Sequence, residues 1–515
     1  MTQADQDGHL PETDTRDQNS YGQIIKSSSI MAGSASVTML MALVRMKFAA
    51  LFMGSAGVGL LAALSNLQLL ISTIAGLGLQ TSAVREIADA VGRNDLISVA
   101  ARVQILRKIS MITGLIGMVV TVLLGNILSL ITFGTTDYAA DICMLGLAVL
   151  VLNLAGAHLA TIQGMRQIGS LARVNIASAL IATFITLLLY YFYGVHAIAP
   201  SLVAVATCQF LFARYFARRI PLDMPVLSWK SAIESAGPMV KLGLALMWSS
   251  VIAQLGVYLL TAFITSTQGL ASTGIYSAAS MVSGVFVGFV LSAMSADFYP
   301  RLAGLSSKKE QMCDLVNQQT EIGLLMSLPG LIVTMALADL ALLVFYSEEL
   351  TQGSGLLAWF VLGCFIRVVT WPLGFTVLAL GRKGLHATIE TIFNLGSLFI
   401  IIPAIHFFGL EAGAIAYVFC YLLYGFGIYL IVRKLIGLKW SVSVVNMIWR
   451  FSLVLVLLLL GFVFLSSNVI WGVGSIVAIV VAVFNVRGLL SRLGNDHRIS
   501  RAILRIPGMR FLKSN

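Results

Sequence analysis

Charge is scarce in this chain. Of its 515 residues, 11% are charged and 58% are apolar, and the mean hydropathy is +0.93. A soluble domain usually carries about 25% charged and about 45–50% apolar residues. Apolar stretches of about 20 residues, the length that spans the hydrocarbon core of a bilayer as a helix, recur from Ser28 to Val486. The composition therefore excludes a soluble enzyme.

Residues for redox, metal and nucleotide chemistry are also few. All five cysteines fall within apolar stretches, and neither they nor the six histidines have metal-ligand spacing. The string nearest to an ATP-binding loop, from Gly374 to Lys383, has the wrong spacing. No soluble segment is long enough for a nucleotide-binding domain. We therefore expect no disulfide framework, metal, cofactor or ATP-driven pump.

The two ends of the chain differ from the apolar body. The N-terminus lacks the basic-then-apolar pattern of a cleavable signal peptide. Residues 1–20 are polar and rich in acids, which indicates a short disordered tail in the cytoplasm. Residues 487–515 form a basic tail, which we expect to lie in the cytoplasm and to contact anionic membrane lipids.

The body of the chain is a series of about fourteen apolar runs separated by polar breaks. Because backbone polar groups in lipid must be hydrogen-bonded within each run, the pattern predicts an all-α polytopic membrane protein. The approximate limits of the runs are 30–53, 59–84, 110–133, 142–164, 174–193, 197–217, 242–264, 273–297, 322–345, 355–379, 387–408, 412–432, 449–466 and 468–486.

Basic residues fall almost entirely into alternate connections between these spans. By the positive-inside rule, this asymmetry predicts that both termini lie in the cytoplasm and that the protein resides in the inner (cytoplasmic) membrane. The net charge of +11 then reflects topology and does not indicate binding to nucleic acid. The connections without Lys or Arg lie near Gly54, Asp137, Gly194, Gln268, Glu348, Gly409 and Ser467.

The chain also repeats weakly. The segment VGLLAALSNLQ at 58–68 resembles TGIYSAASMVS at 273–283, a shift of 215 residues. Six spans that start inside also end inside, so two such units are expected to be parallel repeats. The repeat predicts a six-helix N-terminal half at 21–220 and a six-helix C-terminal half at 221–435. Two additional membrane helices at 436–486 then precede the basic tail.

Only Arg45, Lys47 and Arg367 of the 33 basic residues lie deep within spans. Each costs about 2.5–3.5 kcal/mol at the centre of a membrane helix on insertion scales. Arg45 and Arg367 fall at comparable depth in the two halves, which predicts a cationic cavity for an anionic headgroup, since a guanidinium donates paired hydrogen bonds to phosphate. The alternative is an internal ion pair or a snorkelling side chain. It applies most to Lys47, which points to a different helix face from Arg45.

Acidic residues at membrane depth are fewer still. Asp339 lies near the outer end of the ninth span, and Glu390 lies near the inner end of the eleventh. Both are candidates for carboxylates that couple transport to a counter-moving proton or sodium ion. Glu390 has a second interpretation, which is a pair with His386 or with Lys383.

Prolines interrupt several spans, and a proline inside a helix can act as a hinge. Pro372 and the preceding Trp371 lie just beyond Arg367, so this dipeptide is the best hinge candidate. The other interrupting prolines are Pro200, Pro329 and Pro403.

Three motifs together indicate a family. MALVRMKFAALFMGSAGVGLLAAL at 41–64 has a basic residue in the first span and then an outer turn with Gly54, Gly57 and Gly59. DFYPRL at 297–302 follows the eighth span, and Glu390 lies in the eleventh. Over residues 21–435 the chain resembles the Wzx-type O-antigen flippases of the multidrug/oligosaccharidyl-lipid/polysaccharide (MOP) exporter superfamily.

The resemblance implies two six-helix halves around a central cavity. It implies transport of an undecaprenyl-pyrophosphate-linked oligosaccharide from the cytoplasmic to the periplasmic leaflet by alternating access. Arg45 falls on the basic first-span position of the family and Glu390 on its eleventh-span acid, whereas Arg367 rests on the depth argument alone. Expected partners are the lipid-linked substrate, a proton or sodium ion, and a polysaccharide polymerase with its chain-length machinery.

Two other functions are weighed against this one. A drug or metabolite antiporter of the same superfamily should have acids, not bases, deep in its cavity. A membrane polymerase or ligase of glycans should have a sizeable external loop, and all outer connections of this chain are short. The sequence therefore favours a flippase, which is a transporter and not an enzyme.

Overall fold

The structure is a computed structural model that describes residues 13–223, 227–464 and 467–493. These residues form helices joined by short connections, and no strand occurs among them. The elements are α1 (Thr13–Ala75), α2 (Leu79–Gly92), α3 (Leu96–Leu123), α4 (Gly125–Phe133), α5 (Ala139–Gly164), α6 (Ile168–Tyr193), η1 (Gly194–Ala197), α7 (Ile198–Arg218), α8 (Trp229–Ser235), α9 (Gly237–Gly304), α10 (Lys309–Ala336), α11 (Ala338–Phe345), η2 (Glu348–Gly353), α12 (Ser354–Ala379), α13 (Lys383–Gly396), α14 (Leu398–Phe408), α15 (Leu410–Ile436), α16 (Val442–Phe464) and α17 (Ser467–Leu493).

Eleven helical segments of the described chain are long and apolar enough to cross a membrane. Three of them, Ile30–Ala75, Ile168–Arg218 and Gly237–Ser292, have 46, 51 and 56 residues. A single crossing needs about 20 residues. The first is interrupted at Gly54 (φ 67°) and the third at Gly269 (φ 85°), and the 3₁₀ turn η1 interrupts the second. The prediction of an all-helical membrane protein is confirmed.

Left-handed backbone positions recur along the chain at a constant interval. Gly54, Arg166 and Gly194 have positive φ, and so do the glycines found 215 residues after each of them. This interval equals the shift of the sequence repeat. Positive φ is costly for residues other than glycine, so a chain reversal at these places is built into the local sequence. The later glycines are Gly269, Gly381 and Gly409.

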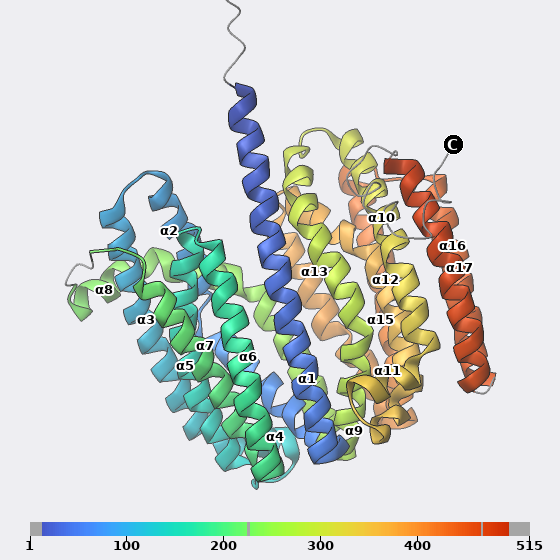
Figure 1. The fold of residues 1–515 in the computed structure, drawn as a ribbon, viewed down its shortest axis with the longest axis horizontal. Coiled ribbons are helices and arrows are strands. Elements are labelled where there is room, and N and C mark those ends of the chain that lie inside the picture. Colours follow the sequence, from blue (N-terminus) through green and yellow to red (C-terminus); the bar gives the residue numbers. More distant parts are fainter. Residues whose placement is uncertain (1–12, 224–226, 465–466, 494–515) are drawn as a thin grey trace, which may run out of the picture.

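Figure 1 shows α1 crossing the molecule between two groups of helices, α2 to α8 on one side and α10 to α17 on the other. The segments of α1 and α9 that follow their breaks pack closely because two glycines meet at the crossing. A Cβ on Gly59 would lie 1.9 Å from the carbonyl oxygen of Leu270, and one on Gly274 would lie 2.0 Å from that of Ser55. Only glycine permits this approach of two backbones.

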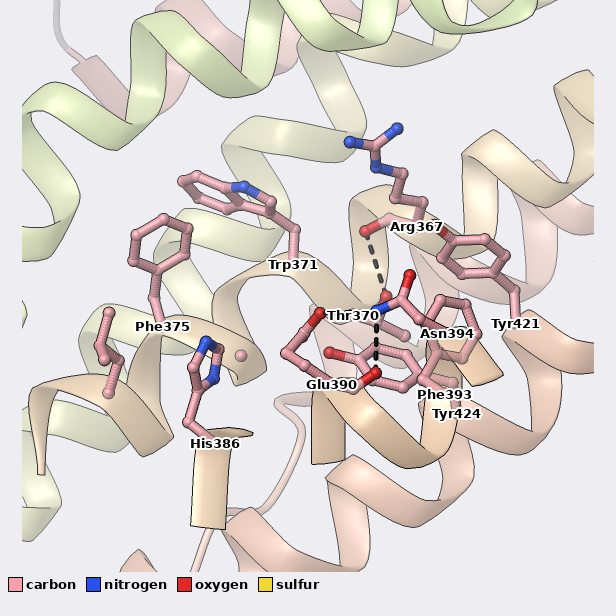
Figure 2. A pocket seen from close by; sticks show the side chains of 12 residues that line it. Arg367, Thr370, Trp371, Phe375, His386, Glu390, Phe393, Asn394, Tyr421 and Tyr424 are labelled. Carbon is pink, nitrogen blue, oxygen red and sulfur yellow. Dashed lines mark hydrogen bonds between the residues drawn. The ribbon is translucent and has the colours of Figure 1, made fainter. Parts of the chain in front are cut away.

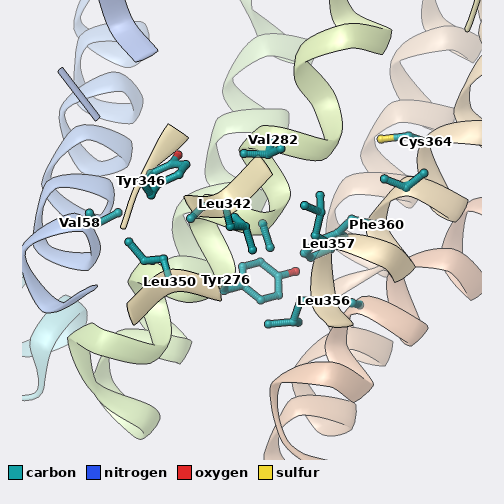
Figure 3. Packing of buried hydrophobic residues seen from close by; sticks show 14 of the residues in the cluster. Val58, Tyr276, Val282, Leu342, Tyr346, Leu350, Leu356, Leu357, Phe360 and Cys364 are labelled. Carbon is teal, nitrogen blue, oxygen red and sulfur yellow. The ribbon is translucent and has the colours of Figure 1, made fainter. Parts of the chain in front are cut away.

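The largest apolar core lies around this crossing (Figure 3). Tyr346 and Phe360 are among the largest fully buried side chains. Tyr276 of α9 packs edge-on against Phe360 of α12 with ring centroids 5.2 Å apart, and Val58 of α1 belongs to the same cluster. Aromatic pairs of this kind add about 0.5–1.5 kcal/mol beyond area burial, so the core ties the two groups of helices together.

The two C-terminal helices lie at the edge of the bundle. α17 packs on α10, where Asn485 donates a hydrogen bond of 2.9 Å to the carbonyl oxygen of Leu325. Several large apolar side chains of α16 are exposed, including Leu453, Leu457 and Phe464, which suits a helix facing lipid. α17 ends at Leu493, so the predicted basic tail begins within a helix. Residues 494–515 lie outside the described residues.

The N-terminal tail also differs from expectation. α1 begins at Thr13, so residues 13–20, predicted to be disordered, belong to a helix that continues into the first span. Adding residues to an existing helix avoids the unfavourable nucleation step, which makes such an extension inexpensive even for polar residues. Residues 1–12 lie outside the described residues.

Candidate functional site

A cavity of about 330 Å³ lies between α12, α13 and α15, and Arg367 is part of its wall (Figure 2). Arg367 is exposed although it lies in the middle of a membrane-length helix. Its position in an open cavity explains this exposure. The other residues lining the cavity are Thr370, Trp371, Gly374, Phe375, Leu378, His386, Glu390, Phe393, Asn394, Tyr421 and Tyr424.

Arg367 and Glu390 share this cavity without forming an ion pair. The charge of Arg367 interacts with the Tyr417 and Tyr421 side chains and, more weakly, with Glu390. In Figure 2 the guanidinium group points away from the carboxylate. The Asn394 amide donates instead to Glu390 Oε2 at 3.3 Å. Within the described part of the chain, Arg367 therefore has no hydrogen-bonded anion of its own.

The alternative interpretation of Glu390 was a pair with His386 or Lys383. In the residues that the structure describes, Glu390 makes no ion pair with either of them. His386 lines the same cavity, and Lys383 is exposed at the start of α13. The carboxylate thus faces a cavity that also contains a histidine, two tyrosines and an amide, all of which can donate hydrogen bonds.

Trp371, one of the two hinge candidates, lines this cavity, and Pro372 follows it in α12. Trp371 packs on Phe375 with ring centroids 4.6 Å apart and on Phe298 of α9 at 5.6 Å. Pro372 is buried inside α12, which continues through it from Ser354 to Ala379. Thr376 donates a hydrogen bond of 2.9 Å to the Pro372 carbonyl oxygen. The helix is unbroken at this proline in the present conformation, and hinge motion there stays a prediction.

Arg45 and Arg367 do not line the same cavity. Arg45 is half-buried in α1 and interacts electrostatically with Tyr190 of α6. Among the described residues it forms no hydrogen bond or ion pair. The two arginines are thus both without an anionic partner among the described residues, but Arg45 does not line the cavity that contains Arg367.

Lys47 and Asp339 lie elsewhere. The Lys47 ammonium donates a hydrogen bond of 2.7 Å to the carbonyl oxygen of Leu343, which places Lys47 against α11. Asp339 lies in the first turn of that same short helix, where a carboxylate is favoured by the helix dipole. An ammonium has three donors, so this contact leaves Lys47 with further capacity, and its role in binding stays a prediction.

A second cavity, of about 420 Å³, lies among α1, α2, α3, α5, α7 and α9. Its polar lining residues are all neutral: Ser72, Thr73, Gln80, Thr81, Ser110, Asn153, Gln209 and Ser250. Sequence reasoning missed it, because single neutral residues in apolar spans give a weak signal.

The sequence repeat relates the two cavities. Four residues that line the second cavity lie 215 positions before residues that line the first. The paired positions are Leu152 with Arg367, Gly156 with Trp371, Leu159 with Gly374, and Gln209 with Tyr424. At three of these four positions the first cavity has a charged or aromatic residue, whereas all four positions of the second cavity are neutral and non-aromatic.

The turn at Gly54 is joined to η2, which lies far along the chain. Glu349 of η2 accepts hydrogen bonds from the Ser55 backbone nitrogen, at 2.9 Å, and from the Ser55 hydroxyl. The turn can approach Glu349 because Gly54 has no Cβ. A Cβ atom at residue 54 would lie 2.8 Å from Glu349 Oε2. This contact closes one end of the α1–α9 crossing, and the sequence offered no signal for it beyond the glycine turn.

Comparisons with known proteins place the chain in a family. The model of the family described as polysaccharide biosynthesis protein matches residues 24–306, more than half of the chain. The Lipid III flippase of Escherichia coli (strain K12) is 24% identical over 374 residues, which is 69% of this chain and 85% of that protein. The Lipid III flippase of Shigella flexneri matches equally well.

Solved structures show the same fold. The structure of the Lipid II flippase MurJ in an inward closed conformation matches with a TM-score of 0.68 at 13% identity, covering 91% of this chain and 99% of that one. A multidrug resistance MATE family transporter of the MOP superfamily, in its inward-facing conformation, matches with a TM-score of 0.67 at 14% identity, covering 78% and 94%. The resemblance to the flippases of the MOP superfamily is thereby confirmed, and these relatives are flippases and transporters, not enzymes. The chain belongs to the polysaccharide biosynthesis protein family.

Proposed function

We propose that this protein is a flippase that moves an undecaprenyl-pyrophosphate-linked oligosaccharide, an O-antigen or related surface polysaccharide unit, from the cytoplasmic to the periplasmic leaflet. The observation that carries the proposal is the pair of unlike cavities at repeat-related positions. One offers an arginine without an anionic partner, and the other offers only neutral hydrogen-bonding groups. A lipid-linked oligosaccharide has both a charged pyrophosphate and neutral sugars.

The charged cavity is proposed to bind the pyrophosphate. A guanidinium group donates paired hydrogen bonds to phosphate oxygens, and Arg367 is free to do so because it has no ion pair with Glu390. Arg45, also without an anionic partner, and Lys47 are proposed to contact the headgroup from the first span. The aromatic side chains Trp371, Tyr421 and Tyr424 complete a wall on which sugar rings can stack.

The neutral cavity is proposed to bind sugar hydroxyl groups. Hydroxyls cannot cross hydrocarbon without hydrogen-bond partners, because each unsatisfied polar group costs about 2–7 kcal/mol in an apolar medium. Amide and hydroxyl side chains can both donate hydrogen bonds to sugar hydroxyl groups and accept hydrogen bonds from them. The lipid tail stays in the bilayer beside the protein during transport.

For the topology, we propose fourteen crossings, with both termini in the cytoplasm. The three longest helical segments each count as two crossings, broken at Gly54, at η1 and at Gly269. The halves 21–220 and 221–435 are supported by the positive-φ positions that recur every 215 residues. Alternating access then requires the halves to rock, with Trp371 and Pro372 as a hinge.

The energy source is proposed to be the membrane potential together with a counter-moving proton or sodium ion. An inside-negative potential favours outward movement of negative charge by about 2.3 kcal/mol per charge per 100 mV. Glu390 and Asp339 are the proposed coupling carboxylates. After release, the substrate is expected to pass to a polysaccharide polymerase with its chain-length machinery.

Deleting the gene tests the proposal. The lipid-linked glycan is expected to accumulate in the cytoplasmic leaflet, where an impermeant sugar-modifying enzyme added outside spheroplasts cannot reach it. Restoring the gene should restore access. Normal outward delivery in the deletion strain, combined with new sensitivity to drugs, would instead support an antiporter of the same superfamily.

A pair of substitutions tests the sugar cavity. Replacing Gln80 and Gln209 by leucine removes two hydrogen-bonding amides, each worth about 0.5–1.5 kcal/mol. We expect the transport rate of the complete oligosaccharide to fall about tenfold, with little effect on a substrate carrying a single sugar. Gln163→Leu, on an exposed position of α5 outside the cavity, is the matched control. Equal losses for both substrates would contradict a sugar site.

A further inference from the structure

A cluster of basic side chains lies on the N-terminal side of the molecule, away from both cavities. It consists of Arg107 on α3, His158 on α5, and Arg214 and Arg218 on α7. α5 packs between α3 and α7. His158 follows Asn153 of the neutral cavity by five residues, a rotation of about 140° around the helix, so it faces the opposite side of α5.

The cluster has no anion within the described part of the chain. The charged groups that act on His158 are Arg107, Arg214 and Arg218, and those that act on Arg107 are Arg218 and Arg214. No described carboxylate is among them. Arg107 Nε and His158 Nδ1 are both buried without a hydrogen-bond partner. Arginine charges held together beside buried polar atoms without partners are costly, and a bound anion would lower that cost.

Phe210 positions two members of the cluster. Its ring centroid lies 5.7 Å from that of His158 and 5.8 Å from the Arg214 guanidinium carbon. A cation over an aromatic face is stabilised by the ring quadrupole. Arg214 and Arg218 are exposed. Phe210 therefore fixes the position of the cluster from its buried side, while the two arginines stay accessible to a ligand.

The surroundings point to a lipid as the source of the anion. Arg107 and Met111 lie four residues apart on α3, and Leu211, Arg214 and Arg218 follow one another at helical spacing on α7. Met111 and Leu211 are 49% and 56% exposed. In the proposed topology, each helix thus presents an exposed apolar side chain one to two turns deeper in the membrane than these basic residues. This order matches an acyl chain below a phosphate group.

We propose that Arg107, His158, Arg214 and Arg218 bind the phosphate group of an anionic phospholipid at the membrane surface, where α5 packs between α3 and α7. The ligand class is a phosphodiester, and the proposed source is the surrounding bilayer and not soluble phosphate. This site is separate from the proposed transport path and does not depend on the transported substrate.

Lipid binding to the purified full-length protein tests the proposal. The protein is kept in neutral detergent and mixed with phosphatidylglycerol, phosphatidylcholine or inorganic phosphate. We measure its melting temperature, and native mass spectrometry identifies the lipids that stay bound. Phosphatidylglycerol alone should raise the melting temperature of the unmodified protein. The apparent affinity for phosphatidylglycerol should fall about tenfold in the double variant Arg214→Gln plus Arg218→Gln.

The control is Arg433→Gln plus Lys434→Gln. These residues are exposed in the last turn of α15, and Arg433 lies 215 residues after Arg218. The control removes the same charge and should keep the phosphatidylglycerol effect. If both double variants lose the same affinity for phosphatidylglycerol, the lipid responds only to the total positive charge, and the proposed site is overturned. Equal stabilisation by inorganic phosphate would overturn the lipid as its source.

Discussion

Replacing Arg367 by alanine is expected to reduce outward delivery of the lipid-linked oligosaccharide by about 100-fold or more. Each hydrogen bond to a charged group contributes about 1.5–3 kcal/mol, and a bidentate guanidinium makes two of them. Arg367 has no described ion-pair partner, so its removal leaves no orphaned carboxylate and should not disturb folding. The measurement is the rate at which the glycan becomes accessible in the outer leaflet of vesicles.

Two variants sharpen this test. Arg367→Lys keeps the charge but loses the planar fork, so it should retain an intermediate rate. Arg382→Ala removes an exposed arginine at the start of α13, outside the cavity, and should transport normally. Full surface-polymer synthesis by the double variant Arg45→Ala plus Arg367→Ala would defeat the proposed anion site.

Replacing Gly274 by alanine is expected to lower the free energy of unfolding by about 1–3 kcal/mol or more. The new Cβ would lie 2.0 Å from the Ser55 carbonyl oxygen and 3.0 Å from the Gly59 backbone nitrogen. Because the obstacles are backbone atoms, no side chain can rotate away, and the α1–α9 crossing must separate. Thermal unfolding in detergent, followed by tryptophan fluorescence, measures the loss.

Gly284 is the matched control on the same helix. A Cβ there meets nothing within 4 Å, and alanine is favoured over glycine inside a helix by up to about 1 kcal/mol. Gly284→Ala should therefore be neutral or stabilising. If both variants unfold at the same temperature as the unmodified protein, the close crossing of α1 and α9 does not contribute to stability.

The helical fold followed from the sequence because the bilayer leaves few choices. A run such as 355–379 is apolar over its whole length, and its backbone can be satisfied in lipid only within a helix. The observed α12 covers Ser354–Ala379. Predicted and observed limits differ more at the ends, where the polar residues 13–20 prolong α1. Polar tails face water in either conformation, so composition does not decide between helix and disorder there.

The site was foreseen only in part. Arg367, Trp371 and Glu390 were all singled out from the sequence, and the fold brings them to one cavity. Arg45 was predicted at a similar depth but does not line this cavity, because depth along a helix says nothing about which face a residue occupies. The neutral cavity was not foreseen, since Gln80 and Gln209 come from helices far apart in the chain.

The sequence by itself determined that this protein is a helical membrane bundle with a few basic side chains at depth, because solvation by lipid acts on each span separately. Only the tertiary structure decided which of those side chains share a cavity, that Lys47 reaches the Leu343 carbonyl, and that Glu349 holds the turn at Ser55. These outcomes depend on how helices rotate and cross. Packing between distant segments, such as the contact of Gly59 with Gly274, sets that geometry.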